Sequence, residues 1–136
     1  MNRLVLDAST AIGWMVDDPS PRLSLHVLGL LQSGAVAVVP ELWYYEVTNA
    51  LMMAERRGRA SAQLVSSHIS DIERLAAFLE LSPTTPSALA AAARQSGLTV
   101  YDAAYFELAL RQNLPLATLD KKMRAAAQKA GIELVK

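Results

Sequence analysis

The sequence predicts an α/β protein built on a parallel β-sheet, and three observations favour this class. Short apolar runs recur along the chain, and each is followed by a stretch with helical spacing of apolar residues. Most of these runs do not alternate apolar and polar residues, which is typical of strands covered on both faces. The helical stretches begin and end at recognisable residues. Strands that alternate with helices therefore predict a three-layer α/β/α sandwich.

Five apolar runs are candidate strands, and the natural expectation is one sheet of five parallel strands. In the order 3-2-1-4-5, the first and fourth strands are neighbours, and the ligand crevice lies outside their carboxyl ends. The candidate strands are residues 3–6, 35–39, 78–82, 116–119 and 132–135.

The helices between these strands are predicted from their ends. Ser20 is expected to cap a helix with proline next in sequence, and glycine at 34 closes it. The next helix runs from about 41 to 57. Ser61, Thr85 and Thr99 each precede a further helix, because serine and threonine are favoured N-caps. The last helix begins at Asp120 and ends before a glycine.

Composition bounds the class of protein. The chain has 136 residues, of which 52% are hydrophobic, so it is long enough for one domain with a real core. It contains no cysteine, which excludes disulfides, thiolate metal sites and a cysteine nucleophile. No apolar run reaches the roughly 18 residues that span a membrane, and the start lacks a basic-then-apolar signal. We therefore expect a single domain over residues 1–136 and a cytoplasmic location.

The charges balance, with 13 basic and 13 acidic residues, so the whole chain lacks the basic excess of many nucleic-acid binders. Two basic clusters are nevertheless candidate phosphate contacts. Arg56 and Arg57 form one with a nearby arginine, and Lys121 and Lys122 follow an aspartate in the other. The alternative is that both clusters are ordinary solvated helix ends.

Four acids stand in unusually apolar surroundings: Asp7, Glu46, Asp102 and Asp120. Carboxylates are rarely buried unless they are paired or bind a metal. Asp7 follows the first strand and Asp120 follows the fourth, so the assumed strand order places both at one edge of the sheet. Each acid also has a simpler interpretation. Asp7, Asp102 and Asp120 can cap or precede helices, and Glu46 can be a paired structural glutamate.

If the four acids do meet, they need a cation. Two unit charges 4 Å apart repel by about 4 kcal/mol at an effective dielectric near 20. Mg²⁺ or Mn²⁺ relieves this repulsion, because both ions prefer oxygen ligands. Zinc is disfavoured, since His26 and His68 are the only histidines and lie on separate predicted helices.

Four segments resemble motifs of the PIN domain family, and within it of the small VapC-type toxins of bacterial toxin–antitoxin pairs. The similarity extends over nearly the whole chain. It is carried by Leu-Asp-Ala-Ser at 6–9, the glutamate helix from Pro40 to Leu51, Leu-Thr-Val-Tyr-Asp-Ala at 98–103, and Leu-Ala-Thr-Leu-Asp at 116–120.

This resemblance implies a ribonuclease that depends on Mg²⁺ or Mn²⁺ and hydrolyses RNA phosphodiesters. It also implies that Ser9 and Thr118 support the acidic site, that the protein is a homodimer, and that an antitoxin tail inhibits it. We expect Asp7 and Asp102 to hold the metal directly. Glu46 and Asp120 would bind a second metal or act through water.

Three other functions are alternatives to a ribonuclease. An aspartyl-phosphate phosphatase normally needs a second aspartate two residues after the first, and Ser9 occupies that position. A receiver domain needs a phospho-accepting aspartate after a central strand, and the second strand ends in Val39-Pro40. A module that binds RNA or a protein partner without cutting remains the main alternative. It predicts RNA binding that is independent of Mg²⁺ and of the four acids.

Overall fold

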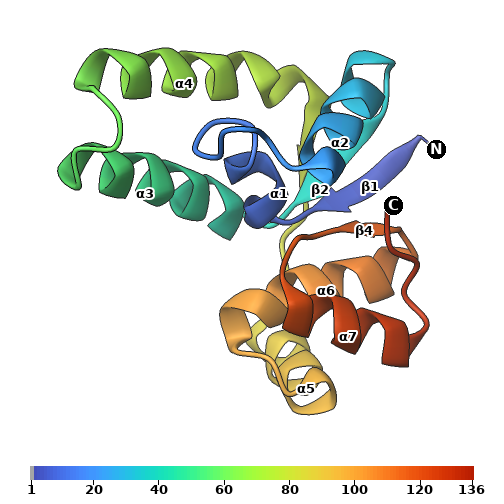
Figure 1. Cartoon of the computed structure of the whole chain (residues 1–136). Coiled ribbons are helices and arrows are strands. Elements are labelled where there is room, and N and C mark those ends of the chain that lie inside the picture. The colour runs from blue at the N-terminus through green and yellow to red at the C-terminus, as the bar shows by residue number, and fades with distance from the viewer. Residues whose placement is uncertain (1) are drawn as a thin grey trace.

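The computed structural model describes residues 2–136 and shows a parallel sheet between two layers of helices (Figure 1). Four strands form the sheet in the order β3-β2-β1-β4. All three pairs of neighbouring strands are parallel. The predicted order of the first four strands is therefore confirmed. The strands are β1 (Arg3–Leu6), β2 (Val36–Val39), β3 (Leu79–Leu81) and β4 (Leu116–Ala117).

The centre of the sheet is apolar because β1 and β2 carry continuous runs of Leu, Val and Ala. Val5 of β1 pairs with Val38 on one side and with Leu116 on the other. All three side chains are fully buried. β1 thus lies between strands on both sides, with the reversal of strand order at its β4 edge. The carboxyl ends of β1 and β4 consequently meet at one edge of the sheet.

The prediction of a five-stranded sheet is wrong in its last strand. The segment expected at 132–135 pairs with the sheet only through an isolated bridge from Leu134 to Leu116. β4 itself is only two residues long. It ends early because two of the next three backbone N–H groups donate to side chains, Leu119 N to Ser9 Oγ and Asp120 N to Thr118 Oγ1. The C-terminal segment still lies beside β4, where the fifth strand was expected.

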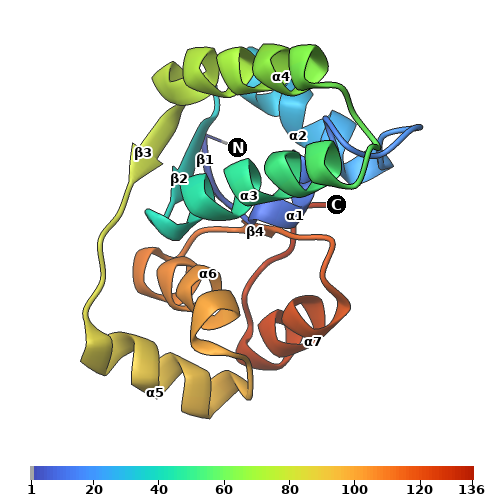
Figure 2. The ribbon, with the colours of Figure 1, turned by 90° about the vertical axis from the view of Figure 1, so that its left-hand side faces the viewer.

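Helices α1–α4 cover one face of the sheet and α5–α7 cover the other (Figure 1). Figure 2 shows the connection from β3 to α5 crossing between these two layers. The helices are α1 (Ala8–Ile12), α2 (Arg22–Gln32), α3 (Leu42–Arg56), α4 (Ala62–Leu75), α5 (Pro86–Ser96), α6 (Val100–Gln112) and α7 (Lys121–Ala130). A 3-10 turn, Ala76–Phe78, precedes β3. Within residues 2–136, none of the helices has both the length and the apolar character to cross a membrane.

The predicted helix starts are confirmed where a hydroxyl caps the helix. Ser61 accepts a hydrogen bond from Leu64 N at 3.1 Å, and Thr85 accepts one from Ala88 N at 3.2 Å. The start of α2 was predicted one residue early: Pro21 rather than Ser20 occupies the N-cap, with no side-chain capping bond.

Candidate acidic active site

Asp7 lies at the carboxyl end of β1 and is 5% exposed. Ser9 Oγ donates to its Oδ2 at 2.6 Å, and Thr118 Oγ1 donates to the same oxygen at 2.7 Å. Neither bond uses Oδ1. Asp7 is the N-cap residue of α1 by position, but its side chain makes no capping hydrogen bond. The capping interpretation of this acid is therefore wrong, and its carboxylate is held by two hydroxyls.

Both hydroxyls are fixed by a second bond. Ser9 Oγ accepts from Leu119 N at 3.0 Å, and Thr118 Oγ1 accepts from Asp120 N at 3.0 Å. Each hydroxyl thus accepts from the backbone while it donates to Asp7. This arrangement ties the segment after β4 to the end of β1, and it orients Asp7 as a hydrogen-bond acceptor.

Glu46 projects from α3 between two buried residues of the same helix, Trp43 and Val47. Its own side chain is half-buried. Tyr105 of α6 donates its hydroxyl to Glu46 Oε1 at 2.5 Å. Because an unpartnered glutamate would be unfavourable here, this bond across the two helix layers supplies the partner that the position needs.

Asp102 and Asp120 each lie at the start of a helix, as their capping interpretations predicted. Thr99 caps α6 by accepting from Asp102 N at 3.2 Å. Asp120 caps α7, because its Oδ1 accepts from Lys122 N at 2.8 Å and Met123 N at 3.1 Å. Neither of these bonds uses Asp120 Oδ2. Capping and a role in the groove are therefore compatible for Asp120, since each needs a different oxygen.

The four acids, which come from four separate parts of the sequence, line one open groove at the carboxyl edge of the sheet. The side chains and backbone of Ala8, Ser9, Ile12, Asn49 and Ala50 complete its walls. No lysine or arginine is among the described residues of this lining. The groove is therefore a concave, strongly acidic surface.

Burial and mutual repulsion disfavour the charged forms of Asp7, Glu46 and Asp102. Burial is the largest effect on Asp7 and raises its pKa. The hydrogen bonds from Ser9 and Thr118 lower this pKa, whereas the nearby charges of Asp102 and Asp120 raise it further. Burial likewise raises the pKa of Glu46, against the bond from Tyr105. The pKa of Asp102 is raised by burial and by Asp120, and lowered by Thr99 and Lys122.

The donor set fits a hard divalent cation. The groove offers carboxylate and hydroxyl oxygens, with no sulfur or imidazole, and these are the ligands that Mg²⁺ and Mn²⁺ prefer. Within residues 2–136, no group of three or more acidic or histidine side chains forms a ready-made metal cage. Mg²⁺ suits such a site, because it usually binds one or two carboxylates and keeps several waters.

The predicted basic contacts lie outside the groove lining. Lys122 is close enough to Asp102 to lower its pKa, whereas Lys121 is exposed on the same turn. Arg56 lines a different hollow, with Tyr44 and Tyr45 on the outer side of α3, and Arg57 is exposed.

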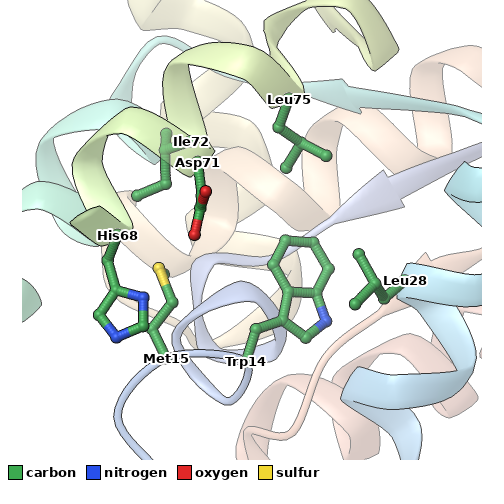
Figure 3. Close-up of a pocket in the computed structure, with 7 residues that line it drawn as sticks. All are labelled: Trp14, Met15, Leu28, His68, Asp71, Ile72 and Leu75. Carbon is green, nitrogen blue, oxygen red and sulfur yellow. The ribbon is translucent and has the colours of Figure 1, made fainter. Parts of the chain in front are cut away.

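Neither histidine is at the groove. His26 is exposed on α2. His68 of α4 lines an apolar pocket with Trp14 and Met15, shown in Figure 3. Trp43 of α3 is fully buried in the core.

Two residues that hold the site together were missed in the sequence. One is Tyr105, which reads as an apolar core residue and is indeed fully buried, although its hydroxyl reaches Glu46. Its position one helical turn after Asp102 is the signal that could have found it. The other is Arg124, whose Nη1 donates to the carbonyl of Thr118 at 2.9 Å.

Fold and site together define an α/β protein with an acidic groove at the carboxyl edge of a parallel sheet, suited to a divalent cation. Family comparison agrees with this class: a sequence model of the PIN domain matches residues 4–129. The chain belongs to the PIN domain family.

Two solved structures illustrate the shared fold. The structure of PAE2754 from Pyrobaculum aerophilum is 24% identical, with a TM-score of 0.69 over 92% of this chain and 79% of that one. The structure of VapBC2 from Rickettsia felis, bound to a DNA fragment from their promoter, is 16% identical. Its TM-score is 0.60 over 98% of this chain and 97% of that one. No curated protein matches the sequence.

Proposed function

We propose that this protein is an endoribonuclease dependent on Mg²⁺ or Mn²⁺ that serves as the toxin of a toxin–antitoxin pair. The observation that carries the proposal is the convergence of four carboxylates from four parts of the sequence on one groove. Membership of the PIN domain family and the fold shared with VapBC2 support it.

Asp7 and Asp102 are our choices to hold the cation directly. Glu46 and Asp120 would bind a second cation or contact the first through water. When bound, the cation supplies positive charge that stabilises the transition state of phosphodiester hydrolysis and lowers the pKa of the attacking water. The absence of a histidine base from the groove is compatible with this chemistry.

The chain's own residues position these ligands. Ser9 and Thr118 anchor Asp7 through Oδ2 and leave Oδ1 free of those bonds. Tyr105 anchors Glu46 through Oε1. The backbone at the start of α7 anchors Asp120 through Oδ1. Each of these three acids is therefore fixed through one oxygen, and its other oxygen can face a cation or an ordered water without rearrangement.

Partners follow from the same proposal. RNA would run along the groove, with Lys121 and Lys122 as candidate phosphate contacts and Arg56 and Arg57 as more distant ones. An antitoxin would inhibit the enzyme by placing a tail in the acidic groove, where a basic side chain would be complementary. We also propose a homodimer, which is the commonest closed assembly.

The decisive experiment is cleavage of structured RNA by the purified, antitoxin-free protein with Mn²⁺. We expect cleavage that is abolished by EDTA and reduced at least about 100-fold by Asp7→Asn. Asp71→Asn is the matched control, because Asp71 is an exposed acid on α4 paired with Arg74. If Asp7→Asn cuts as fast as the wild type, the acidic site is not catalytic. RNA binding that ignores both EDTA and Asp7→Asn would identify a non-cleaving binding module instead.

A further inference from the structure

A second hollow lies beside the acidic groove, between the first turns of α3 and α6. It also draws on the carboxyl end of β2, the connection after β3, and α5. Most of its lining is apolar: Pro40, Leu42, Pro83, Leu89, Val100 and Tyr101.

The two hollows share their walls. On α6, Tyr101 lines the second hollow and the next residue, Asp102, lines the acidic groove. On α3, Leu42 lines the second hollow and Glu46 lines the groove. Those two residues are one helical turn apart, about 6 Å along the helix axis. A nucleotide next to one whose phosphate lies in the groove is therefore within reach of the second hollow.

The charge of the second hollow argues against a phosphate as its occupant. Among the described residues that line it, Glu41 is the one charged side chain, and it is acidic and exposed. An anion would be repelled by Glu41, which no lysine or arginine of the lining offsets. The hollow suits a neutral group that can donate hydrogen bonds to a carboxylate. Nucleobases with amino or ring N–H groups have this character.

Tyr101 provides an aromatic surface at the mouth of the second hollow. It is 66% exposed, although the seven residues from Ala103 to Ala109 on the same helix are all buried. Packing in the monomer therefore does not account for an aromatic residue at this position. Exposed aromatic side chains of this kind stack on the unpaired bases of single-stranded RNA.

Thr84 supplies an unsatisfied polar group in the same place. It lines the second hollow, and its hydroxyl oxygen is buried without a hydrogen-bond partner. A buried hydroxyl without a partner is unfavourable, so an occupant that bonds to it gains affinity. The edge of a nucleobase offers both donors and acceptors for such a bond.

We propose that this hollow is a base pocket, which holds one unstacked nucleobase of the RNA strand beside the phosphate that is cut. Tyr101 stacks on the base, and Thr84 and Glu41 contact its edge. The base pocket makes cleavage depend on the identity of one nucleotide next to the cut. This inference rests on the proposed ribonuclease function and adds a specificity determinant to it.

The test is the base preference of cleavage with Mn²⁺, measured on single-stranded RNA oligonucleotides randomised on both sides of the cut. We expect the wild type to prefer one base at one flanking position. Tyr101→Ala should lower kcat/KM for cleavage about tenfold whichever base is present, the size of one lost stacking contact, because stacking tolerates every base. Thr84→Val removes only the unsatisfied hydroxyl, so it should change which base is preferred while the melting temperature is maintained.

Tyr45→Ala is the matched control. Tyr45 is 67% exposed and immediately precedes Glu46, just as Tyr101 precedes Asp102, but it lies outside the base pocket. It should keep the wild-type kcat/KM and base preference. Wild-type protein that cuts RNA, with Tyr101→Ala keeping its kcat/KM within twofold, would overturn the base pocket and leave the ribonuclease standing.

Three other outcomes would also overturn the base pocket. Equal loss in Tyr45→Ala and Tyr101→Ala would mean that exposed aromatic residues act without a specific pocket. An effect of Tyr101→Ala on self-association or antitoxin binding alone would assign the hollow to a protein partner. Wild-type protein that cuts no RNA would remove the proposed function and the base pocket together.

Discussion

Replacing Thr118 by valine tests whether the hydroxyl bonds around Asp7 stabilise the fold. Thr118 is fully buried, and valine has nearly the same shape, so the change removes hydrogen bonds with little effect on packing. One lost bond is to a buried carboxylate, worth about 1.5–3 kcal/mol. The other leaves the Asp120 N–H without its partner, which costs about 1 kcal/mol or more. We expect the free energy of unfolding to fall by about 3 kcal/mol and the melting temperature by about 10 °C.

The chain offers a matched control in Thr10→Val. Thr10 is also fully buried, but its hydroxyl has no hydrogen-bond partner. Removing that hydroxyl should therefore change stability by less than about 1 kcal/mol, or increase it. Urea denaturation of the metal-free wild type and both variants at neutral pH measures the difference. If Thr118→Val loses no more stability than Thr10→Val, the hydroxyl bonds to Asp7 do not stabilise the folded state.

The difference in unfolding free energy between the wild type and Thr118→Val should also depend on pH, which gives a second test. The bond from Thr118 lowers the pKa of Asp7, so it stabilises the ionised carboxylate. As the pH falls and Asp7 takes up a proton, the difference in unfolding free energy between the wild type and Thr118→Val should become smaller. Burial holds the pKa of Asp7 above its ordinary value of 3.8, so this difference should begin to shrink at a pH above 3.8. A gap that stays constant down to acid pH would contradict the assignment of the bond to the ionised form.

Three further predictions follow from the groove. Three of its carboxylates have raised pKa values, so the metal-free folded state binds more protons than the unfolded state. Its melting temperature should therefore fall as the pH rises from ~4 to neutral. Mn²⁺ at 100 times its Kd should raise the free energy of unfolding by about 2.7 kcal/mol and so raise the melting temperature again. A melting temperature at neutral pH that ignores Mn²⁺ would count against the cation site. Tyr105→Phe removes the bond that lowers the pKa of Glu46. For RNA cleavage, kcat/KM should therefore fall about tenfold, and the acid limb of its pH profile should move to higher pH. An unchanged pH profile would show that this bond does not alter the pKa of Glu46. Lys122→Ala should weaken RNA binding and reduce the slope of log binding constant against log salt concentration by about 1. Lys129→Ala, at the exposed far end of α7, should leave both quantities unchanged. Equal effects of the two variants would indicate that positive charge contributes without a specific contact.

The parts of the fold that follow from local chemistry could be predicted. Ser61, Thr85 and Thr99 cap helices because their hydroxyls satisfy free N–H groups, and that signal lies within four residues of sequence. The four acids could be singled out because each stands in apolar sequence. Their meeting in one groove depended on the strand order, which the sheet confirms for the first four strands.

What the sequence did not predict depends on contacts between distant segments. The early end of β4 is set by Ser9, more than a hundred residues before it, and no local pattern records that bond. Tyr105 looked like a core residue, and only the fold, which brings α6 and α3 together at the edge of the sheet, reveals Glu46 as the partner of its hydroxyl. Thr84 and Tyr101 likewise line one hollow only because the connection from β3 to α5 passes from one helix layer to the other.

The bond between Asp7 and Thr118 spans 111 residues of sequence and has a consequence for how the protein is made. A growing chain on the ribosome carries Asp7 long before Thr118, and it cannot close the groove until Thr118 and Asp120 have been synthesised and have emerged. Proteolytic fragments that lack either end of the chain lose the groove in the same way. The complete acidic surface is therefore available only late in synthesis, and a chain that lacks Thr118 and Asp120 cannot form it.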